Sequence, residues 1–350
     1  MARALASRSE DTERLRLPEV SPEAAAVVVT HNTREVLARC LARVAAPGAE
    51  VVVVDTGSTD GSRELVAEQH PELHYIYLAE NAGFGAAANE GVRHTRRPYV
   101  LLLNADAWPC ADAIRRLVAV AEFDPAIAVV APAHVDALGT PQRSVFGYPG
   151  GPAALALWAA SPGIVSRSFA VLQRVRGGLA TLPRGRRAAP RVDGPGHEEV
   201  RRGEFPSGAA LLLRREAFLR LGGFDERFFM YSEETDLCHR LRDRGWKVVY
   251  APGATVVHVG AASTSLEADR MYLEQLRSYI RFIAKHSGRG RAERARRLLA
   301  AALRVRALAT PRGERAHARD AARWLSSHDL ATVIEEPDER RETKQRPSSR

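Results

Sequence analysis

Runs of consecutive apolar residues alternate with segments of helical periodicity over residues 24–135. Apolar runs such as AAAVVV and VLLL are typical of strands buried on both faces of a parallel sheet. Between them, apolar residues recur at every third or fourth position, as on one face of an amphipathic helix. We therefore expect an α/β fold with a doubly wound, mostly parallel sheet. The predicted strands are 24–30, 51–54, 73–78, 100–103 and 126–131.

The alternation is interrupted over residues 136–203, which are rich in Pro, Gly and Arg. We interpret this stretch as an irregular insertion over one face, either a solvated basic loop or an anion-binding lid. Order resumes beyond it, with further strands expected at 209–213, 247–250 and 255–259 and helices at 215–221 and 266–286. The expected organisation is a disordered arm (1–22), the main α/β domain (23–265), a helical basic extension (266–333) and a disordered tail (334–350).

Composition and charge narrow the classes of partner. The chain of 350 residues has 51 Lys and Arg against 42 Asp and Glu, a net charge of +9, which favours nucleotides, nucleic acid or anionic lipid. Cys40, Cys110 and Cys238 form no CxxC motif, which fits a reducing compartment and excludes a thiolate metal site. We find no signal-peptide pattern and no long apolar span, so we expect a cytoplasmic protein.

The segment from Arg289 to Arg323 carries eleven arginines and three acids. Leucines give it an apolar side, and a basic amphipathic helix pair can lie on an anionic membrane surface. Alternatively, these helices pack on the protein and turn their arginines to water. The sequence leaves open whether the protein makes peripheral contact with the inner face of the membrane.

Polar residues follow the predicted strands at their carboxyl ends, where open α/β sheets bind ligands. They include Thr30, Asn32, Asp55 and the VLLLNAD segment that ends in Asp106. A carboxylate in that place can hold a divalent cation, which in turn holds phosphates. The alternative is that Asp106 caps the next helix, with Trp108-Pro109 as its first turn. Ser58, Thr59 and Asp60 are candidate caps for the helix at 63–69.

Three acids, Glu233, Glu234 and Asp236, lie at the start of another predicted helix. The helix dipole alone favours acids there. Three neighbouring carboxylates also repel one another, and repulsion can leave one of them with the raised pKa of a general base. His258, on a late strand, is by itself a core residue. Together with Asp106 and the acidic cluster, it becomes a candidate metal ligand.

Six stretches in this order resemble inverting family 2 glycosyltransferases of the GT-A fold, and lean towards the bacterial rhamnosyltransferase-like branch. They cover most of residues 24–265. They are VVVTHN (27–32), VVVDTGSTDGS (52–62), NAGFGAAANEG (81–91), LLLNADA (101–107), SGAALLLRREAFLRLGGFDERFFMYSEETDLCHRLRDRGWKVVYAP (207–252) and VVHVG (256–260).

The resemblance implies roles for single residues. Asp106 and His258 would bind Mg²⁺ or Mn²⁺, Glu234 would be the catalytic base, and Glu233 and Asp236 complete its cluster. Asn104 stands in place of the first Asp of the family's DxD motif, and Glu234 in place of an Asp. The nucleotide-sugar-binding residues would be Thr30, Asn32, Asp55, Ser58, Asn81, Gly83, Asn89, Asn104 and Asp106.

The implied reaction moves a sugar from a nucleotide-diphosphate donor, with dTDP-rhamnose as a candidate, to a hydroxyl of a glycan or lipid-linked glycan. Glu234 would take the proton of that hydroxyl, and the anomeric centre would invert. Such a reaction belongs to cell-wall or polysaccharide biosynthesis.

Three alternatives were weighed. The GxGxxA pattern at 83–88, with Asp106 further on, fits an NAD(P)-dependent enzyme, but two βα units precede it and the acidic cluster is left without a role. A nucleotidyltransferase would need a basic phosphate loop, for which residues 30–34 offer only Arg34. A nucleic-acid module has no recognition motif here, so we expect no nucleic-acid partner.

Overall fold

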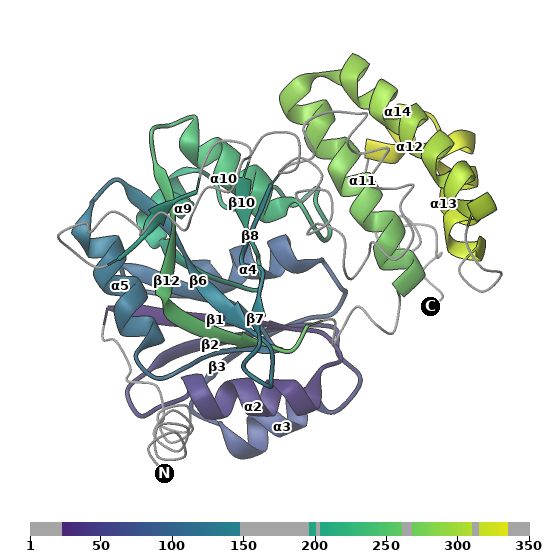
Figure 1. The fold of residues 1–350 in the computed structure, drawn as a ribbon. Coiled ribbons are helices and arrows are strands. Elements are labelled where there is room, and N and C mark those ends of the chain that lie inside the picture. Colours follow the sequence, from purple (N-terminus) through teal and green to yellow (C-terminus); the bar gives the residue numbers. More distant parts are fainter. Residues whose placement is uncertain (1–22, 148–195, 201–203, 261–267, 310–314, 335–350) are drawn as a thin grey trace, which may run out of the picture. The chain divides into compact units, whose positions relative to one another are not determined.

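The computed structural model describes residues 23–147, 196–200, 204–260, 268–309 and 315–334 (Figure 1). The arm (1–22), most of the 136–203 insertion and nearly all of the tail (334–350) lie outside these residues. The chain divides into two compact units. The sheet unit comprises Met1–Val145, Val192–Phe229 and Glu233–Glu267, and the helical unit comprises Phe146–Arg191, Met230–Ser232 and Ala268–Arg350.

A mixed, mostly parallel sheet forms the centre of the sheet unit, with the strand order β3-β2-β1-β4-β11-β6-β12-β5. Neighbours among β3, β2, β1 and β4 are parallel, as are β6 and β12, whereas β11 and β5 run antiparallel to their neighbours. The predicted sheet is therefore confirmed. The path strands are β1 (Ala24–Thr30), β2 (Glu50–Thr56), β3 (His74–Leu78), β4 (Tyr99–Asn104), β5 (Ala107–Pro109), β6 (Ile127–Val135), β11 (Ala210–Arg214) and β12 (Lys247–His258).

Among the residues that the structure describes, four short strands lie off this path and six helices belong to the sheet unit. The short strands are β7 (Pro141–Gln142), which pairs with β6, β9 (Glu198–Glu199), which pairs with β12, β8 (Val145–Gly147) and β10 (Glu204–Pro206). The helices are α2 (Arg34–Val44), α3 (Ser62–Gln69), α4 (Phe84–Arg93), α5 (Ala113–Phe123), α9 (Arg215–Arg220) and α10 (Glu233–Arg242).

The apolar runs form the central strands because both faces of the sheet are covered. Val27, Val28 and Leu101–Leu103 are completely buried. Helix α4 packs especially close: a Cβ on Gly91 would lie 2.4 Å from Val27 Cγ1. A glycine is needed there because any side chain would push this helix off the sheet.

One alternative and one strand prediction are wrong. Trp108 and Pro109 do not begin a helix, as the alternative for Asp106 required; they belong to β5, which pairs antiparallel with the end of β12. The two strands expected at 247–250 and 255–259 are one strand, with an irregularity between Ala251 and Thr255. Pro252 and Gly253 interrupt the apolar pattern and so suggested that a strand ends there. In the structure β12 pairs with β6 both before and after this irregularity.

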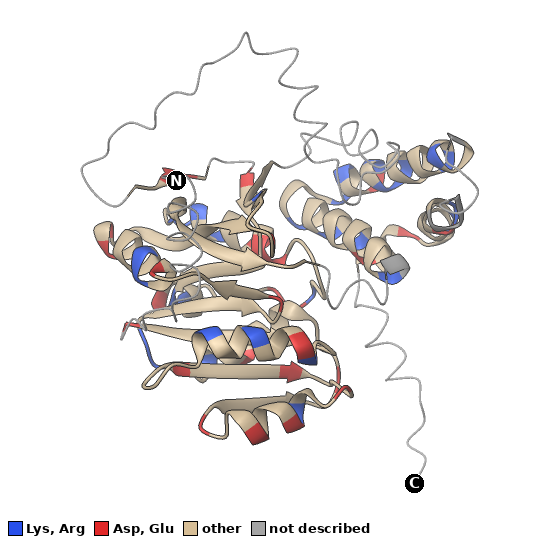
Figure 2. Ribbon diagram, turned by 60° about the horizontal axis from the view of Figure 1, so that its bottom comes forward, with Lys and Arg blue, Asp and Glu red and all other residues tan. Residues whose placement is uncertain are grey.

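The helical unit contains α11 (Ala268–Ser287), α12 (Arg289–Ala309), α13 (Arg315–Ser327) and α14 (Leu330–Ile334). Its core is formed by residues such as Leu276, Leu299 and Leu325, which are fully buried. Lys and Arg recur along its helices (Figure 2). Among the helices described, none combines the length and the apolar character needed to span a membrane.

Candidate active site

Three strand ends meet at one edge of the sheet. In the parallel ladders, Thr30 of β1 lies opposite Asp55 of β2, and Val29 lies opposite Asn104 of β4. Side chains that follow these residues are therefore neighbours although they come from three separate segments. This is the edge at which the sequence predicted a ligand.

Hydrogen bonds join the loops that follow β1 and β2. The Asn32 backbone N–H donates to Ser58 Oγ (2.9 Å), and the Thr59 N–H donates to Asn32 Oδ1 (2.8 Å). Asp60 accepts from the backbone N–H groups of Arg34 and Ser62, and so caps the first turns of α2 and α3 together. Of the three candidate caps in this loop, Asp60 is therefore the one that caps the helices. Its hydrogen bonds hold the two loops together.

Asp55 and Thr30 are buried residues near the ends of the two strands that precede these loops. Asp55 is fully buried and accepts hydrogen bonds from the Ser58 N–H (2.8 Å) and the Tyr75 O–H (2.5 Å). Burial, together with the hydrogen bond to Asp55, raises the pKa of Tyr75. Thr30 is 1% exposed and shares a hydrogen bond with Thr33. Asn32 and Ser58 are partly exposed, whereas Asp55 and Thr30 are buried and stabilise the loops that carry Asn32 and Ser58.

Asp106 and His258 are brought together by the pairing of β5 with β12. His258 lies opposite Ala107 in that ladder, and the Val259 N–H donates to the Asp106 carbonyl (3.0 Å). As a result, His258 Nε2 lies 3.7 Å from Asp106 Oδ1, and the two side chains are 21% and 8% exposed. The proximity predicted for these residues is thus observed.

The chemistry of this pair suits a divalent cation, since a carboxylate oxygen and an imidazole nitrogen are both common ligands of Mn²⁺ and related ions. Within the described ranges no group of three or more His, Cys, Asp or Glu could hold a metal ion by itself. A cation at this pair would therefore need further ligands from a substrate or from water. Asn104, two residues before Asp106, adds no charge.

Glu234 is a buried carboxylate in the first turn of α10. It is 8% exposed, and a Cβ on Gly208 would lie 3.7 Å from its Cγ. Burial raises the pKa of Glu234 to about 7. The sequence predicted a raised pKa in this cluster from repulsion among the acids, but the structure attributes it to the loss of hydration. Glu233 instead packs towards α4, with its Cβ 3.7 Å from the position of a Cβ on Gly85.

The backbone segment 207–209 lies beside both the base candidate, Glu234, and Asn104, which is two residues before Asp106. The Ala209 carbonyl accepts a hydrogen bond from the Asn104 N–H (3.0 Å), and Gly208 contacts Glu234. Ala210 then pairs with Leu103 in the β11–β4 ladder. Because β11 runs antiparallel to β4, residues 207–209 lie beside the carboxyl end of β4, where a Cβ on Gly208 would be in ordinary van der Waals contact with Glu234.

Asp236 has a structural partner. It is fully buried, and Arg240 Nε donates to its Oδ2 at 2.6 Å. Arg240 also donates to the carbonyls of Leu221 and Gly223. This network ties α10 to the loop before it and accounts for Asp236 without substrate contact.

Asn89 holds the same loop from α4. Its Nδ2 donates to the Phe224 carbonyl and to Glu226 Oε1, and its Oδ1 accepts from the Phe224 N–H (2.8 Å). At 4% exposure, Asn89 shapes the site through this loop rather than by reaching into solvent.

The backbone of Phe229 occupies the space beside Gly83 in the glycine-rich turn. Gly83 has a φ of +83°, and a Cβ there would lie 2.2 Å from the Phe229 carbonyl oxygen. Asn81 Oδ1 accepts from the Gly83 N–H, and the Phe84 N–H donates to Phe229. Because this turn is closed against residue 229, it offers no cradle for a dinucleotide phosphate, and the NAD(P) alternative loses its main support.

Two consecutive non-glycine residues, Tyr231 and Ser232, have left-handed backbone angles (φ 66° and 64°) directly before α10. Each such residue costs on the order of 1–2 kcal/mol. The strain lies immediately before Glu233 and Glu234, where it fixes the direction in which the acidic turn begins.

His134, in β6, is a residue that the sequence analysis missed. It is 2% exposed, its ring centroid lies 5.8 Å from that of His258, and its Nε2 has no hydrogen-bond partner among the described residues. Burial lowers its pKa to about 3, so it packs beside His258 as a neutral ring. A histidine inside an otherwise apolar strand was the available signal. Tyr75 and Gly208 were missed because their partners are distant in sequence.

Comparisons with known proteins agree with this geometry. The model of the family "Glycosyl transferase family 2" matches residues 25–174, and that of "Glycosyl transferase family group 2" matches residues 200–311. The N-acetylglucosaminyl-diphospho-decaprenol L-rhamnosyltransferase of Mycobacterium tuberculosis is 30% identical over 290 residues, which cover 76% of this chain and 86% of that protein. The predicted resemblance to the rhamnosyltransferase-like branch is confirmed.

Two solved structures share the fold. One is the mannosyltransferase PcManGT from Pyrobaculum calidifontis in complex with GDP-Man and Mn²⁺ (TM-score 0.50, 19% identity, covering 95% of this chain and 92% of that one). The other is GalNAc-T7 with UDP, GalNAc and Mn²⁺ (TM-score 0.51, 16% identity, covering 89% and 57%). They confirm the expected GT-A fold. With these matches and the arrangement of the strand ends, the chain belongs to glycosyl transferase family 2.

Proposed function

We propose that the protein transfers a sugar from a nucleoside-diphosphate donor to a hydroxyl group of a glycan or lipid-linked glycan, with inversion at the anomeric carbon. The observation that carries the proposal is the joint placement of two chemical groups. The Ala209 carbonyl accepts a hydrogen bond from Asn104, which lies two residues before Asp106 of the Asp106–His258 pair, and the buried carboxylate of Glu234 lies beside Gly208. A charge-binding group and a candidate base are thus held at one edge of a rigid sheet.

Asp106 and His258 would hold Mg²⁺ or Mn²⁺, and a cation there supplies neutralisation of charge on the departing diphosphate. Asn32 and Ser58, presented by the braced loops, would orient the nucleoside. Thr30 and Asp55 would keep those loops in place, and Asn81, Gly83 and Asn89 would shape the wall of the sugar pocket. Asn104 would contribute a neutral amide next to the diphosphate.

Glu234 would act as the general base. Its pKa of about 7, caused by burial, leaves an appreciable ionised fraction near neutrality, and its basicity is far higher than that of an exposed carboxylate. It would accept the proton of the acceptor hydroxyl as that oxygen attacks the anomeric carbon from the face opposite the leaving group. Glu233 would remain a wall residue, and Asp236 a positioning residue that acts through Arg240.

The identity of a relative guides the choice of substrates. The M. tuberculosis relative is named as a rhamnosyltransferase acting on N-acetylglucosaminyl-diphospho-decaprenol. We propose dTDP-rhamnose as the first donor to test and a polyprenyl-diphosphate-linked sugar as the acceptor. Such a reaction would contribute to cell-envelope polysaccharide and would take place at the cytoplasmic face of the membrane.

A panel of nucleotide sugars tests the proposal through the thermal stability of the protein, measured with and without Mn²⁺. A ligand that binds the native state raises the midpoint according to its concentration and affinity. We expect one dTDP-, UDP- or GDP-sugar to raise it, and more so with Mn²⁺. Stabilisation by NAD(H), with no response to any nucleotide sugar, would overturn the proposal.

A further inference from the structure

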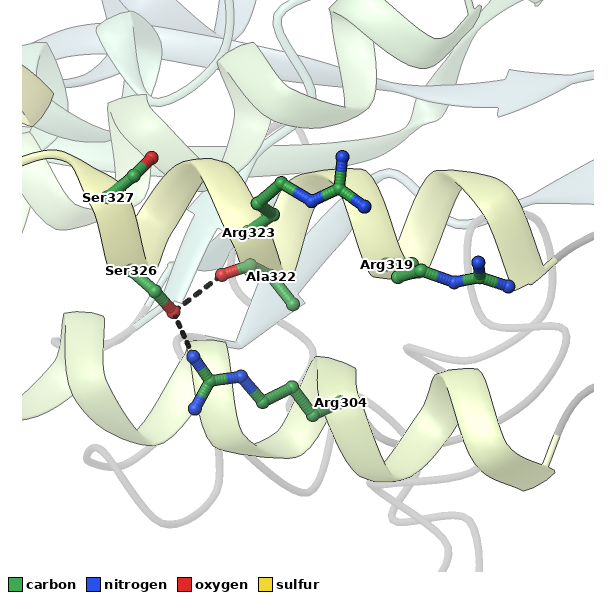
Figure 3. A pocket seen from close by; sticks show the side chains of 6 residues that line it. All are labelled: Arg304, Arg319, Ala322, Arg323, Ser326 and Ser327. Carbon is green, nitrogen blue, oxygen red and sulfur yellow. Dashed lines mark hydrogen bonds between the residues drawn. The ribbon is translucent and has the colours of Figure 1, made fainter.

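A basic pocket lies in the helical unit, between α12 and α13. It has a volume of about 460 Å³ and is lined by Arg304, Arg319, Ala322, Arg323, Ser326 and Ser327 (Figure 3). Arg304 reaches across from α12 to α13, where its Nη2 donates to Ser326 Oγ (2.8 Å). Arg319 and Arg323 project from α13 one turn apart. Three guanidinium groups and two hydroxyl groups therefore border one opening.

The positive charge of this pocket is not compensated. In the part of the chain that the structure describes, no ion pair joins Arg304, Arg319 or Arg323 to a carboxylate. Elsewhere on α12 the situation differs, since Arg296 and Arg297 both pair with Glu293 at 2.7 Å. Three exposed arginines that line one pocket without an ion-paired carboxylate form a site for an anion, and their planar forks match the oxygens of a phosphate.

An exposed apolar row lies on α12, the helix that carries Arg304. Leu298 is 41% exposed, Val305 60% and Leu308 81%. Their spacing of seven and three residues places them on one face of the helix, and Val305 directly follows Arg304. The exposure of large apolar side chains to water is unfavourable, and their position on the same helix as Arg304 suggests a ligand that has an apolar part as well as an anionic group.

We propose that this pocket binds the phosphate group of an anionic membrane lipid, while Val305 and Leu308 enter the outer part of the acyl-chain region. The combination carries the inference: arginines for the headgroup and apolar side chains on the adjacent helical face, as in helices that lie in a membrane interface. The residues of this pocket belong to the helical unit, whereas Asp106, His258 and Glu234 belong to the sheet unit, and the proposal goes beyond the proposed transfer reaction.

Flotation of the full chain with vesicles tests the pocket. The parent chain and the R304Q/R319Q/R323Q variant are compared on phosphatidylcholine vesicles with and without phosphatidylglycerol, at physiological salt. The matched control is R289Q/R291Q/R294Q, which removes three exposed arginines from the start of α12, away from the pocket. Circular dichroism establishes that both variants are folded.

We expect the parent and the control to float with phosphatidylglycerol vesicles, and the pocket variant to lose about a hundredfold in partitioning, because each arginine at a membrane surface contributes roughly fivefold. An equal loss of partitioning in both variants would show that binding depends on net charge alone, and would overturn the proposal. Failure of the parent to float would do the same. Displacement of the parent by inorganic phosphate at the concentration of the vesicle phosphate would reassign the pocket to a soluble phosphate.

Insertion is measured separately with the L308W variant and vesicles that carry brominated acyl chains. We expect stronger fluorescence quenching than in the parent when phosphatidylglycerol is present, and no excess quenching without it. Quenching equal to that of the parent under both conditions would contradict the insertion of α12. Neither experiment requires sugar transfer, so their failure is distinguishable from failure of the proposed reaction.

Discussion

His258 Nε2 lies 3.7 Å from Asp106 Oδ1, although the two residues belong to different strands that are far apart in the sequence. The antiparallel pairing of His258 with Ala107 produces this proximity. Asp106 therefore cannot be understood as a helix cap, because the residues that follow it form a strand. The pair is the feature on which the proposed metal binding depends.

Removal of either member of this pair is expected to weaken Mn²⁺ binding. We expect D106A and H258A to lower the affinity for Mn²⁺, measured by electron paramagnetic resonance in the presence of a nucleoside diphosphate, by at least about tenfold. The control is E216Q, which removes an exposed acid on α9. Unchanged affinity in D106A would contradict the assignment.

The two glutamates of α10 are expected to differ in their effect on turnover. Because Glu234 would be the proton acceptor, E234Q should lower kcat by about 10²–10⁴-fold, whereas E233Q should retain most of the activity. Steady-state kinetics with the donor identified by thermal shift provides the measurement. Loss of activity in E233Q with retention in E234Q would transfer the role of base to Glu233.

Activity and stability should respond to pH in opposite directions through Glu234. The base must be ionised, so kcat/KM should rise with pH on a limb near the pKa of about 7. The folded state binds this proton more tightly than the unfolded chain, whose value is 4.5, so the stabilisation is complete below about pH 4.5 and is lost as the pH rises through 7. Urea unfolding across this range should show that E234Q removes this component; an unchanged slope would contradict it.

Asn89 is expected to support the fold more than the binding of the nucleotide. N89A leaves the buried Phe224 N–H and carbonyl without their partner, so the free energy of unfolding should fall by about 2–4 kcal/mol. N81A loses one hydrogen bond at a half-buried position and should cost about 1 kcal/mol. Urea denaturation compares the two variants. An N89A protein as stable as the parent would contradict this structural role.

The close packing of Gly83 in the glycine-rich turn is tested by comparison with Gly222, a glycine of similar φ. Both have positive φ, 83° and 82°, but a Cβ on Gly83 meets the Phe229 carbonyl oxygen at 2.2 Å, whereas Gly222 has nothing within 4 Å. G222A should therefore cost only the backbone term of about 1–2 kcal/mol. G83A should cost several kcal/mol more and displace residue 229, which thermal and urea unfolding will detect. Equal costs would contradict the tight closure.

The sequence by itself determined the sheet and its active edge. Consecutive apolar residues, as in Val100–Leu103, predict a strand that is covered on both faces. Polar residues such as Asn32 and Asp106 then lie at the carboxyl ends of these strands. The acidic turn at Glu233–Asp236 was visible for the same reason, since helix starts and strand ends are marked by residues close together in the chain.

Only the tertiary structure decided which residues became partners. The antiparallel course of β11, the β5–β12 ladder, the neutral His134 beside His258 and the loop bound by Asn89 all depend on contacts between segments distant in sequence. The same holds for Glu234, whose raised pKa comes from burial beside Gly208 rather than from its neighbours in the chain. Hydrophobic periodicity is a local property, whereas desolvation and strand pairing depend on what the rest of the chain places alongside.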